Sequence, residues 1–409
     1  MMASDDETTI SVVHTADCHL GYKPGNMAFN KQIERMKDVW KNFDIICKFT
    51  LDTNADIFII AGDLFHTNLP GNQDRFKVTK ALREIHDNGT SIVIVGGNHD
   101  MPRSREEGKS PIATLAAAGI AHFLESPNTI ESVLLDIKGK VVRVSGLSFN
   151  NLALPTDDPV QGINIPVDGD FNIFVTHANA SFHKKKREDE YKFEMTDIPE
   201  SIHYVALGHI HEETMSTRPN ATVANKTFFV YPGSIEHLEI VDEPKPKCFY
   251  RVLFHQDGNV ELDRQPLETR LTRVVTAEID KTTLNVHDAI VEQFPDNIPK
   301  ESIVKLRLKG TLNLDVLETY KKVQLLDEYS ERFFSFSIDD TSDLKKYSPQ
   351  ANIEDVENAR PRTVLETYLE KAIADASTDG DKQLLKDVKA VILDAFNKHA
   401  EEINMGDET

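Results

Sequence analysis

The stretch DIFIIAGDLFH, residues 56–66, joins an apolar run to a polar end that contains glycine. A short apolar run bounded in this way is typical of a buried strand. Two other runs share the pattern, at residues 10–14 and 91–95, and both end in polar or glycine-rich residues. We therefore predict three buried strands, each followed by a loop that carries polar side chains.

Two amphipathic segments separate these strands. Residues 31–51 place apolar side chains at intervals of three or four, and residues 74–86 repeat the pattern. Strands that alternate with helices predict a parallel sheet covered by helices, and ligands bind such sheets beyond the carboxyl ends of the strands. After residue 130 the sequence is rich in strands, which we assign to the second half of the same layered domain. These strands are predicted at residues 141–146, 172–176, 204–207, 227–231 and 249–254.

The composition limits the classes of function. A chain of 409 residues, 40% of them hydrophobic and 28% charged, predicts a globular protein of two or three domains. The formal net charge of −21 repels polyanions, so any binding of nucleic acid must be local. Cys18, Cys47 and Cys248 have no metal-like or disulfide-like spacing. With no secretory signal and no apolar run long enough to span a membrane, we expect a cytoplasmic protein with inert thiols.

Polar residues follow five of the predicted strands. Each alone is a weak signal, because a histidine at a strand end is more often structural and an aspartate after glycine is usually a turn former. Together they are informative, because the sheet gathers the carboxyl ends of its strands at one edge. The candidate residues are Asp17, His19, Asp63, His66, Asn98, His99, Asp100, His177, His209 and His211.

This set contains carboxylates, imidazoles and one amide, without a thiolate. Such ligands suit Mn²⁺, Fe²⁺ or Zn²⁺ better than Ca²⁺ or a structural zinc. The two oxygens of Asp63 are enough to bridge two cations. Two divalent cations that clamp a phosphoryl group promote hydrolysis of a phosphoester. We therefore predict a two-metal phosphoesterase, in which a histidine outside the metal ligands stabilises the transition state or acts as an acid.

The order Asp-x-His, Gly-Asp, Gly-Asn-His-Asp, His and Gly-His-x-His resembles the calcineurin-like metallophosphoesterase superfamily. The strings HTADCHLG (14–21), AGDLFH (61–66), ALGHIH (206–211) and YPGS (231–234) are similar to the SbcD-type DNA double-strand-break repair nucleases. The resemblance implies an α/β fold: a layered calcineurin-like phosphoesterase domain of two sheets flanked by helices, a small α/β capping domain and a C-terminal helix pair.

The resemblance also implies a role for each matching residue. Two divalent ions are expected, with Mn²⁺ as the favoured metal. One would be held by Asp17, His19, Asp63 and His211, and the other by Asp63, Asn98, His177 and His209. His99 would be the transition-state stabiliser or the acid, oriented by Asp100. His66 matches a second histidine that contacts phosphate in these nucleases, and a helix-cap or packing role is the alternative.

Four segments are expected. Residues 1–268 would be the nuclease domain, and residues 269–340 a DNA-capping domain, with strands near 274–279, 303–308 and 333–338 and helices near 286–294 and 316–328. Residues 341–362 are polar, contain two prolines and are predicted to be a linker. Residues 363–409 carry two amphipathic helices, which could pack on their own domain or on a partner.

The resemblance implies that the C-terminal helices bind an SMC-like coiled-coil ATPase of the SbcC type, and that the protein is a homodimer without membrane attachment. Phe76, Val78, Leu82 and Ile85 offer an apolar face for dimerisation, although they could simply cover the sheet. The basic run at residues 183–187 could contact DNA phosphates or form a solvated loop. No phosphate-binding glycine loop for ATP is found in the chain.

The function implied by the resemblance is a Mn²⁺-dependent nuclease, a 3′ to 5′ exonuclease on duplex DNA ends and an endonuclease on single strands or hairpins. Two alternatives remain open at this point. One is a phosphodiesterase or phosphatase for a small substrate, which would use the same metals. The other is a non-catalytic tether of DNA ends, in which the metals are structural.

Overall fold

The computed structural model describes residues 8–104, 108–183, 191–218, 226–241 and 244–347, and also residues 369, 370, 373, 380 and 382–392. The chain divides into two compact units. The first comprises Met1–Val275, Pro295–Arg307 and Val323–Asp339, and the second comprises Thr276–Phe294, Leu308–Lys322 and Asp340–Thr409. This division does not follow the predicted boundary after residue 268, since residues 269–275, 295–307 and 323–339 all belong to the first unit.

The first unit contains a sheet in the order β14-β13-β1-β2-β3-β4. Four of its strands are parallel, and two antiparallel strands extend it beyond β1. The three predicted strands are confirmed, whereas β4 and β14 were not predicted from the sequence. The strands are β1 (Ile10–Thr15), β2 (Ile57–Ala61), β3 (Ser91–Val95), β4 (His122–Leu124), β13 (Cys248–Phe254) and β14 (Val260–Pro266).

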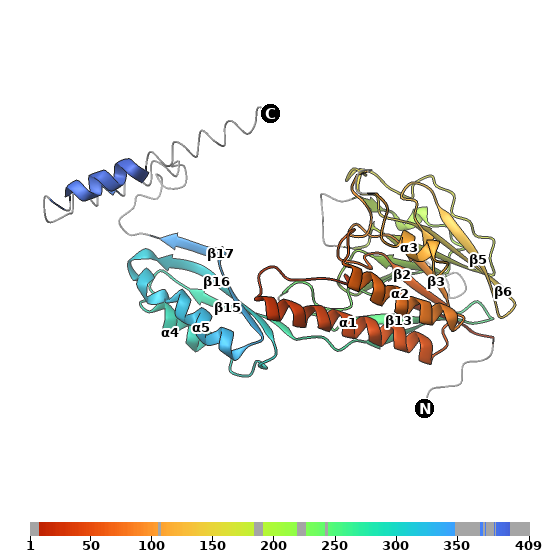
Figure 1. The fold of residues 1–409 in the computed structure, drawn as a ribbon, viewed down its shortest axis with the longest axis horizontal. Coiled ribbons are helices and arrows are strands. Elements are labelled where there is room, and N and C mark those ends of the chain that lie inside the picture. Colours follow the sequence, from red (N-terminus) through yellow and green to blue (C-terminus); the bar gives the residue numbers. More distant parts are fainter. Residues whose placement is uncertain are drawn as a thin grey trace. The chain divides into compact units, whose positions relative to one another are not determined.

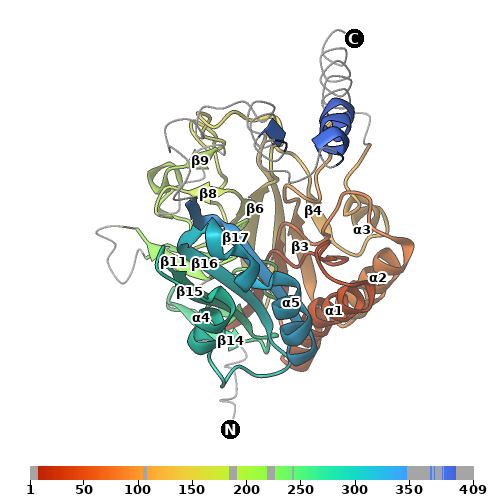
Figure 2. The ribbon, with the colours of Figure 1, turned by 90° about the vertical axis from the view of Figure 1, so that its left-hand side faces the viewer.

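Helices α1 (Phe29–Asp52) and α2 (Asn72–Asp87) lie side by side on one face of this sheet, as Figures 1 and 2 show, and the short α3 (Ala113–Ala117) precedes β4. Both long helices were predicted. The proposal that this helix offers an apolar face for dimerisation is corrected. Val78, Leu82 and Ile85 are buried against the sheet of their own chain, because a helix that covers a sheet must bury its apolar face there. Only Phe76 is exposed.

A second sheet in the order β11-β12-β10-β7-β6-β5 packs against the first. Alternation along the strands fills the space between the sheets, where Val12 and Ile59 of one meet Val144 and Ile173 of the other. The strands are β5 (Glu131–Ile137), β6 (Lys140–Leu147), β7 (Phe171–His177), β10 (Tyr204–Gly208), β11 (Thr214–Thr217) and β12 (Phe228–Tyr231), with the minor β8 (Asn179–Ala180), β9 (Lys192–Phe193) and η2 (Met195–Asp197).

A third sheet has the order β15-β16-β17, with β15 (Thr272–Ile279), β16 (Ile303–Asn313) and β17 (Ser335–Tyr347). The associated helices are α4 (Val286–Gln293), η4 (Leu314–Tyr320) and α5 (Lys322–Arg332). The single helix predicted for residues 316–328 is wrong, because Lys321 adopts a left-handed conformation (φ 44°) that interrupts it. Strand β17 also continues through residues 341–347, where a linker was predicted, and Leu344 in this stretch is buried.

Residues 382–392 are helical, and Leu384 and Val391 in this stretch are exposed. Most of the predicted helix pair at residues 363–409, and the remainder of the predicted linker, lie outside the described residues. In the ranges that the structure covers, no helix is both long and apolar enough to cross a membrane.

His14 on β1 links the two packed sheets. Its side chain is fully buried, and its Nδ1 lies 2.7 Å from the hydroxyl oxygen of Tyr204 on β10. Burial lowers the pKa of His14 from 6.5 to about 3, because the charged imidazolium is poorly solvated inside the protein.

We predict that His14 destabilises the protein in acid. Between pH 6.5 and 3 the unfolded chain binds a proton at this residue and the folded chain does not, so the free energy of unfolding falls as the pH falls. At pH 5 the loss is about 2 kcal/mol. The variant His14→Gln lacks this loss, so its deficit relative to wild type should shrink by that amount between pH 7.5 and pH 5. Urea unfolding with EDTA present measures both proteins, and a deficit that does not change with pH would contradict the prediction.

Candidate metal centre

The ten candidate residues lie at the carboxyl ends of five strands drawn from both packed sheets. Strands β1, β2 and β3 of the first sheet lead into the segments that carry Asp17 and His19, Asp63 and His66, and Asn98 to Asp100. Strands β7 and β10 of the second sheet supply His177, as the last residue of β7, and the segment with His209 and His211. Packing the two sheets therefore brings residues that are far apart in the sequence to one edge.

The first group of potential ligands surrounds His19. Its Nε2 lies 3.1 Å from Nε2 of His211 and 3.5 Å from Oδ2 of Asp63. The Nε2 of His211 is 3.9 Å from Oδ1 of Asp17. Asp17, His19 and Asp63 are almost completely buried, and His211 is partly exposed. These are the four residues that the resemblance assigns to one ion.

The second group surrounds Asn98. Its Oδ1 lies 3.1 Å from Nε2 of His177 and 3.1 Å from Nδ1 of His209. The Nε2 of His177 is also 3.5 Å from Oδ2 of Asp63. The same carboxylate oxygen therefore faces His19 in the first group and His177 in the second, which is the arrangement that a bridging ligand requires.

The donor set fits divalent cations. Ligand atoms that each lie about 2 Å from one cation lie about 3 Å from one another, and the closest contacts within both groups have this spacing. His177 adds a second sign, because its Nδ1 lies 2.9 Å from the carbonyl oxygen of Ala61. A carbonyl only accepts, so Nδ1 carries the proton and donates it there. In the neutral ring, which a bound cation would favour, this leaves the lone pair on Nε2, as is usual for histidines that bind metals.

The backbone at the site is strained. Four candidate ligands, Asp17, His19, Asp63 and His209, have positive φ angles of 50°, 46°, 50° and 93°. Non-glycine residues rarely adopt this conformation, and such strain clusters at functional sites. Close packing of the sheets also demands Gly208, because a Cβ atom at this position would lie 1.8 Å from the carbonyl oxygen of Ala61.

Asp100 has a different role from the one predicted. Its carboxylate accepts backbone N–H groups from Leu64 (2.9 Å), Phe65 (2.8 Å) and Gly97 (3.3 Å), so it holds the segment that follows Asp63. The ring of His99 is oriented instead by the carbonyl oxygen of His66, 3.0 Å from Nδ1. The prediction that Asp100 orients His99 is therefore corrected, because three backbone donors occupy its carboxylate.

His66 lies in a bend, so the helix-cap alternative does not apply. Its Nδ1 is 3.2 Å from Nδ1 of His19, and its ring stacks on that of His99 with centroids 5.1 Å apart. Tyr22 contacts the His66 ring edge-on. The structure therefore places His66 beside the candidate ligands, next to Nδ1 of His19, whereas His211 lies next to Nε2.

Burial and mutual charge shift the pKa values of the site. Burial raises the pKa of Asp17 to about 7. Burial would also raise the pKa of Asp63, but His177 and His19 lower it well below its usual range. Burial opposes a charge on His177, yet Asp63 and Asp17 raise its pKa to about 9. The buried carboxylates of this site are therefore stabilised by nearby positive charge, and a bound divalent cation would supply it.

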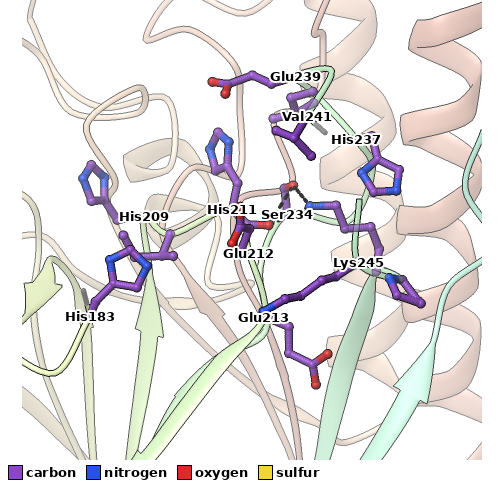
Figure 3. A pocket seen from close by; sticks show the side chains of 14 residues that line it. His183, His209, His211, Glu212, Glu213, Ser234, His237, Glu239, Val241 and Lys245 are labelled. Carbon is purple, nitrogen blue, oxygen red and sulfur yellow. Dashed lines mark hydrogen bonds between the residues drawn. The ribbon is translucent and has the colours of Figure 1, made fainter. Parts of the chain in front are cut away.

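Lys247 and Ser234, to which the sequence analysis gave no role, hold the backbone of His211. Buried Lys247 donates from Nζ to the carbonyl oxygen of His211 (2.6 Å) and to Oγ of Ser234 (2.9 Å). The backbone N–H of Ser234 donates to the same carbonyl at 3.1 Å. Figure 3 shows the pocket that these residues line together with His209 and His183. A lone lysine before a strand has no motif, so sequence reasoning had no signal for Lys247.

The basic run proposed as a DNA contact begins at His183, which lines this pocket. Its remaining residues, 184–187, lie outside the part of the chain that the structure describes.

The chain is similar to several known proteins. Residues 10–213 match the family described as calcineurin-like phosphoesterase. A solved structure of a dimetal phosphatase from Danio rerio aligns with 63% of this chain and 96% of that chain, with 9% identity and a TM-score of 0.37.

Several relatives are named for DNA repair. The DNA double-strand break repair protein Mre11 of Sulfolobus acidocaldarius is 22% identical over 79% of this chain and 81% of that protein. The protein of the same name from Archaeoglobus fulgidus is 24% identical over 81% of this chain and 75% of that protein. The double-strand break repair protein MRE11 of Arabidopsis thaliana is 22% identical over 97% of this chain and 63% of that protein. The family match and the two packed sheets together show that residues 10–213 form a calcineurin-like phosphoesterase domain.

Proposed function

We propose that this protein is a two-metal DNA nuclease that processes double-strand breaks, as a 3′ to 5′ exonuclease on duplex ends and an endonuclease on single strands or hairpins. The observation that carries the proposal is the shared carboxylate of Asp63, which faces both groups of potential ligands. The similarity to the Mre11 proteins over most of the chain supports DNA as the substrate.

Asp17, His19, Asp63 and His211 would hold one cation, and Asp63, Asn98, His177 and His209 the other. Mn²⁺ is our choice, since it accepts carboxylate, amide and imidazole ligands together. When bound, two such cations supply Lewis-acid stabilisation of a phosphate diester and an activated nucleophile.

We propose that His99 stabilises the negative charge that develops on the phosphate in the transition state. Its backbone N–H donates to Oδ1 of Asp63 (2.9 Å), and its Nδ1 is anchored on the carbonyl oxygen of His66. These contacts leave Nε2 as the atom that can carry a second proton toward a phosphate oxygen or the leaving oxygen. Asp100 is a positioning residue, because it fixes the segment that contains the His66 carbonyl.

We predict that His99→Ala lowers Mn²⁺-dependent cleavage of labelled duplex DNA by about 10²-fold or more, because a transition-state donor is lost, while bound metal is retained. The matched control is His255→Ala. This histidine follows β13, whose end pairs with the start of β1 at the edge of the sheet opposite the candidate ligands.

Activity of His99→Ala equal to wild type would remove His99 from the mechanism. Cleavage of bis-p-nitrophenyl phosphate by wild type without cleavage of any DNA would favour a small-substrate phosphoesterase. Bound metal without hydrolysis of either substrate would favour a non-catalytic tether of DNA ends.

We further propose that residues 269–340 cap the DNA, that the protein acts as a homodimer, and that residues 363–409 bind an SMC-like coiled-coil ATPase. The exposed Leu384 and Val391 support the last point, because an amphipathic helix with an uncovered apolar face can bind a partner. Deletion of residues 363–409 should abolish co-purification with the ATPase and leave hydrolysis of bis-p-nitrophenyl phosphate intact. Loss of both would mean that these helices belong to the core.

A further inference from the structure

A third group of donor atoms lies beside the candidate metal centre. His19, His66 and His99 each offer one ring nitrogen, and these three atoms lie within 4.8 Å of one another. The group meets the centre at His19, whose Nε2 faces Asp63 and His211 while its Nδ1 faces His66. One imidazole therefore connects two neighbouring sets of potential ligands.

We propose that His19, His66 and His99 form an inhibitory zinc site that competes with the two-metal centre for His19. The binding claim stands on the geometry of the three rings alone. The inhibition rests on the proposed function, because it requires that His19 and His99 act in cleavage.

The spacing of the nitrogens fits zinc. Two nitrogens that each lie about 2.0–2.1 Å from a tetrahedral Zn²⁺ are about 3.3 Å apart. The Nδ1 atoms of His19 and His66 are 3.2 Å apart. Two lone pairs repel each other at this distance unless a proton or a cation lies between them, and a zinc ion meets that requirement.

The orientation of His99 suits a ligand. Its Nδ1 lies 3.0 Å from the carbonyl oxygen of His66, which only accepts, so this nitrogen carries the proton. The lone pair is then on Nε2, in the arrangement that orients most zinc-binding histidines. His66 thus contributes to the proposed site through its own ring and through the carbonyl that holds His99.

The chemistry of the donors separates this site from the two-metal centre. Three imidazoles without a carboxylate favour Zn²⁺ over Mn²⁺, because borderline nitrogen ligands follow the Irving–Williams order. The neighbouring groups contain Asp17 and Asp63 and therefore accept Mn²⁺ as well. His66 and His99 are only partly buried, so solvent reaches this side of the cluster and can supply a fourth ligand.

Competition follows from the shared ring of His19. A neutral imidazole has one lone pair for a cation, and its other nitrogen carries a proton. Two cations bound at Nε2 and Nδ1 of the same ring would also lie close together and repel each other. Zinc at Nδ1 therefore weakens the ligand at Nε2, and it also removes His99 from its proposed role in catalysis.

Cobalt(II) is the probe that separates the two sites. Asp63→Asn removes the shared carboxylate of the two-metal centre and keeps an oxygen that can accept the His99 backbone N–H. Tetrahedral Co²⁺ absorbs visible light strongly, and six-coordinate Co²⁺ absorbs weakly. In this full-length background, one equivalent of Co²⁺ should give the strong absorption, and Zn²⁺ should displace it.

The matched comparison adds His66→Gln, His99→Gln or the distant control His255→Gln to Asp63→Asn. Loss of one of three ligands should weaken Co²⁺ binding by at least as much as loss of an outer-shell partner, roughly 10- to 100-fold. The first two double variants should therefore lose the absorption at one equivalent, and the control should keep it. Strong absorption that survives His66→Gln, or no strong absorption in the Asp63→Asn background, would overturn the proposal. Neither readout involves cleavage, so failure of the nuclease proposal would be seen separately in the DNA assay.

Discussion

The buried carboxylate of Asp63 is the group on which the site depends. Its Oδ2 faces His19 and His177, its Oδ1 accepts the backbone N–H of His99, and its own carbonyl accepts the backbone N–H of His19 at 2.9 Å. A buried negative charge is costly unless opposite charge and hydrogen bonds surround it. The surrounding loops supply these partners together only when the two sheets are packed. The stability of the buried charge on Asp63 therefore depends on the fold.

The packing of the sheets sets the separation of the two halves of the site. His177 on β7 donates to the carbonyl of Ala61 on β2, and Gly208 on β10 lets the same carbonyl approach closely. At the other side, Lys247 and Ser234 hold the backbone of His211. The potential ligands are therefore held by the scaffold before any cation arrives, which lowers the entropy cost of binding.

Much of this was predictable from sequence. Periodicity and polar strand ends predicted the central strands, α1, α2 and the residues that the structure brings together. The left-handed backbone at Asp17 or His209, the clamp made by Asp100 and the support from Lys247 were not predictable, because they depend on contacts between distant segments. The extension of β17 into residues 341–347 was also missed. Its polar side chains are typical of a linker, and the sequence alone does not show the strand with which they pair.

The central claim is that seven side chains from five strands converge on two divalent cations. Anomalous diffraction at the manganese edge, from crystals soaked in Mn²⁺, tests it directly. The account predicts two peaks per chain, one on either side of the Asp63 carboxylate, the first beside His19 and His211 and the second beside Asn98 and His177. A single peak remote from Asp63, or none with the side chains turned apart, would contradict it.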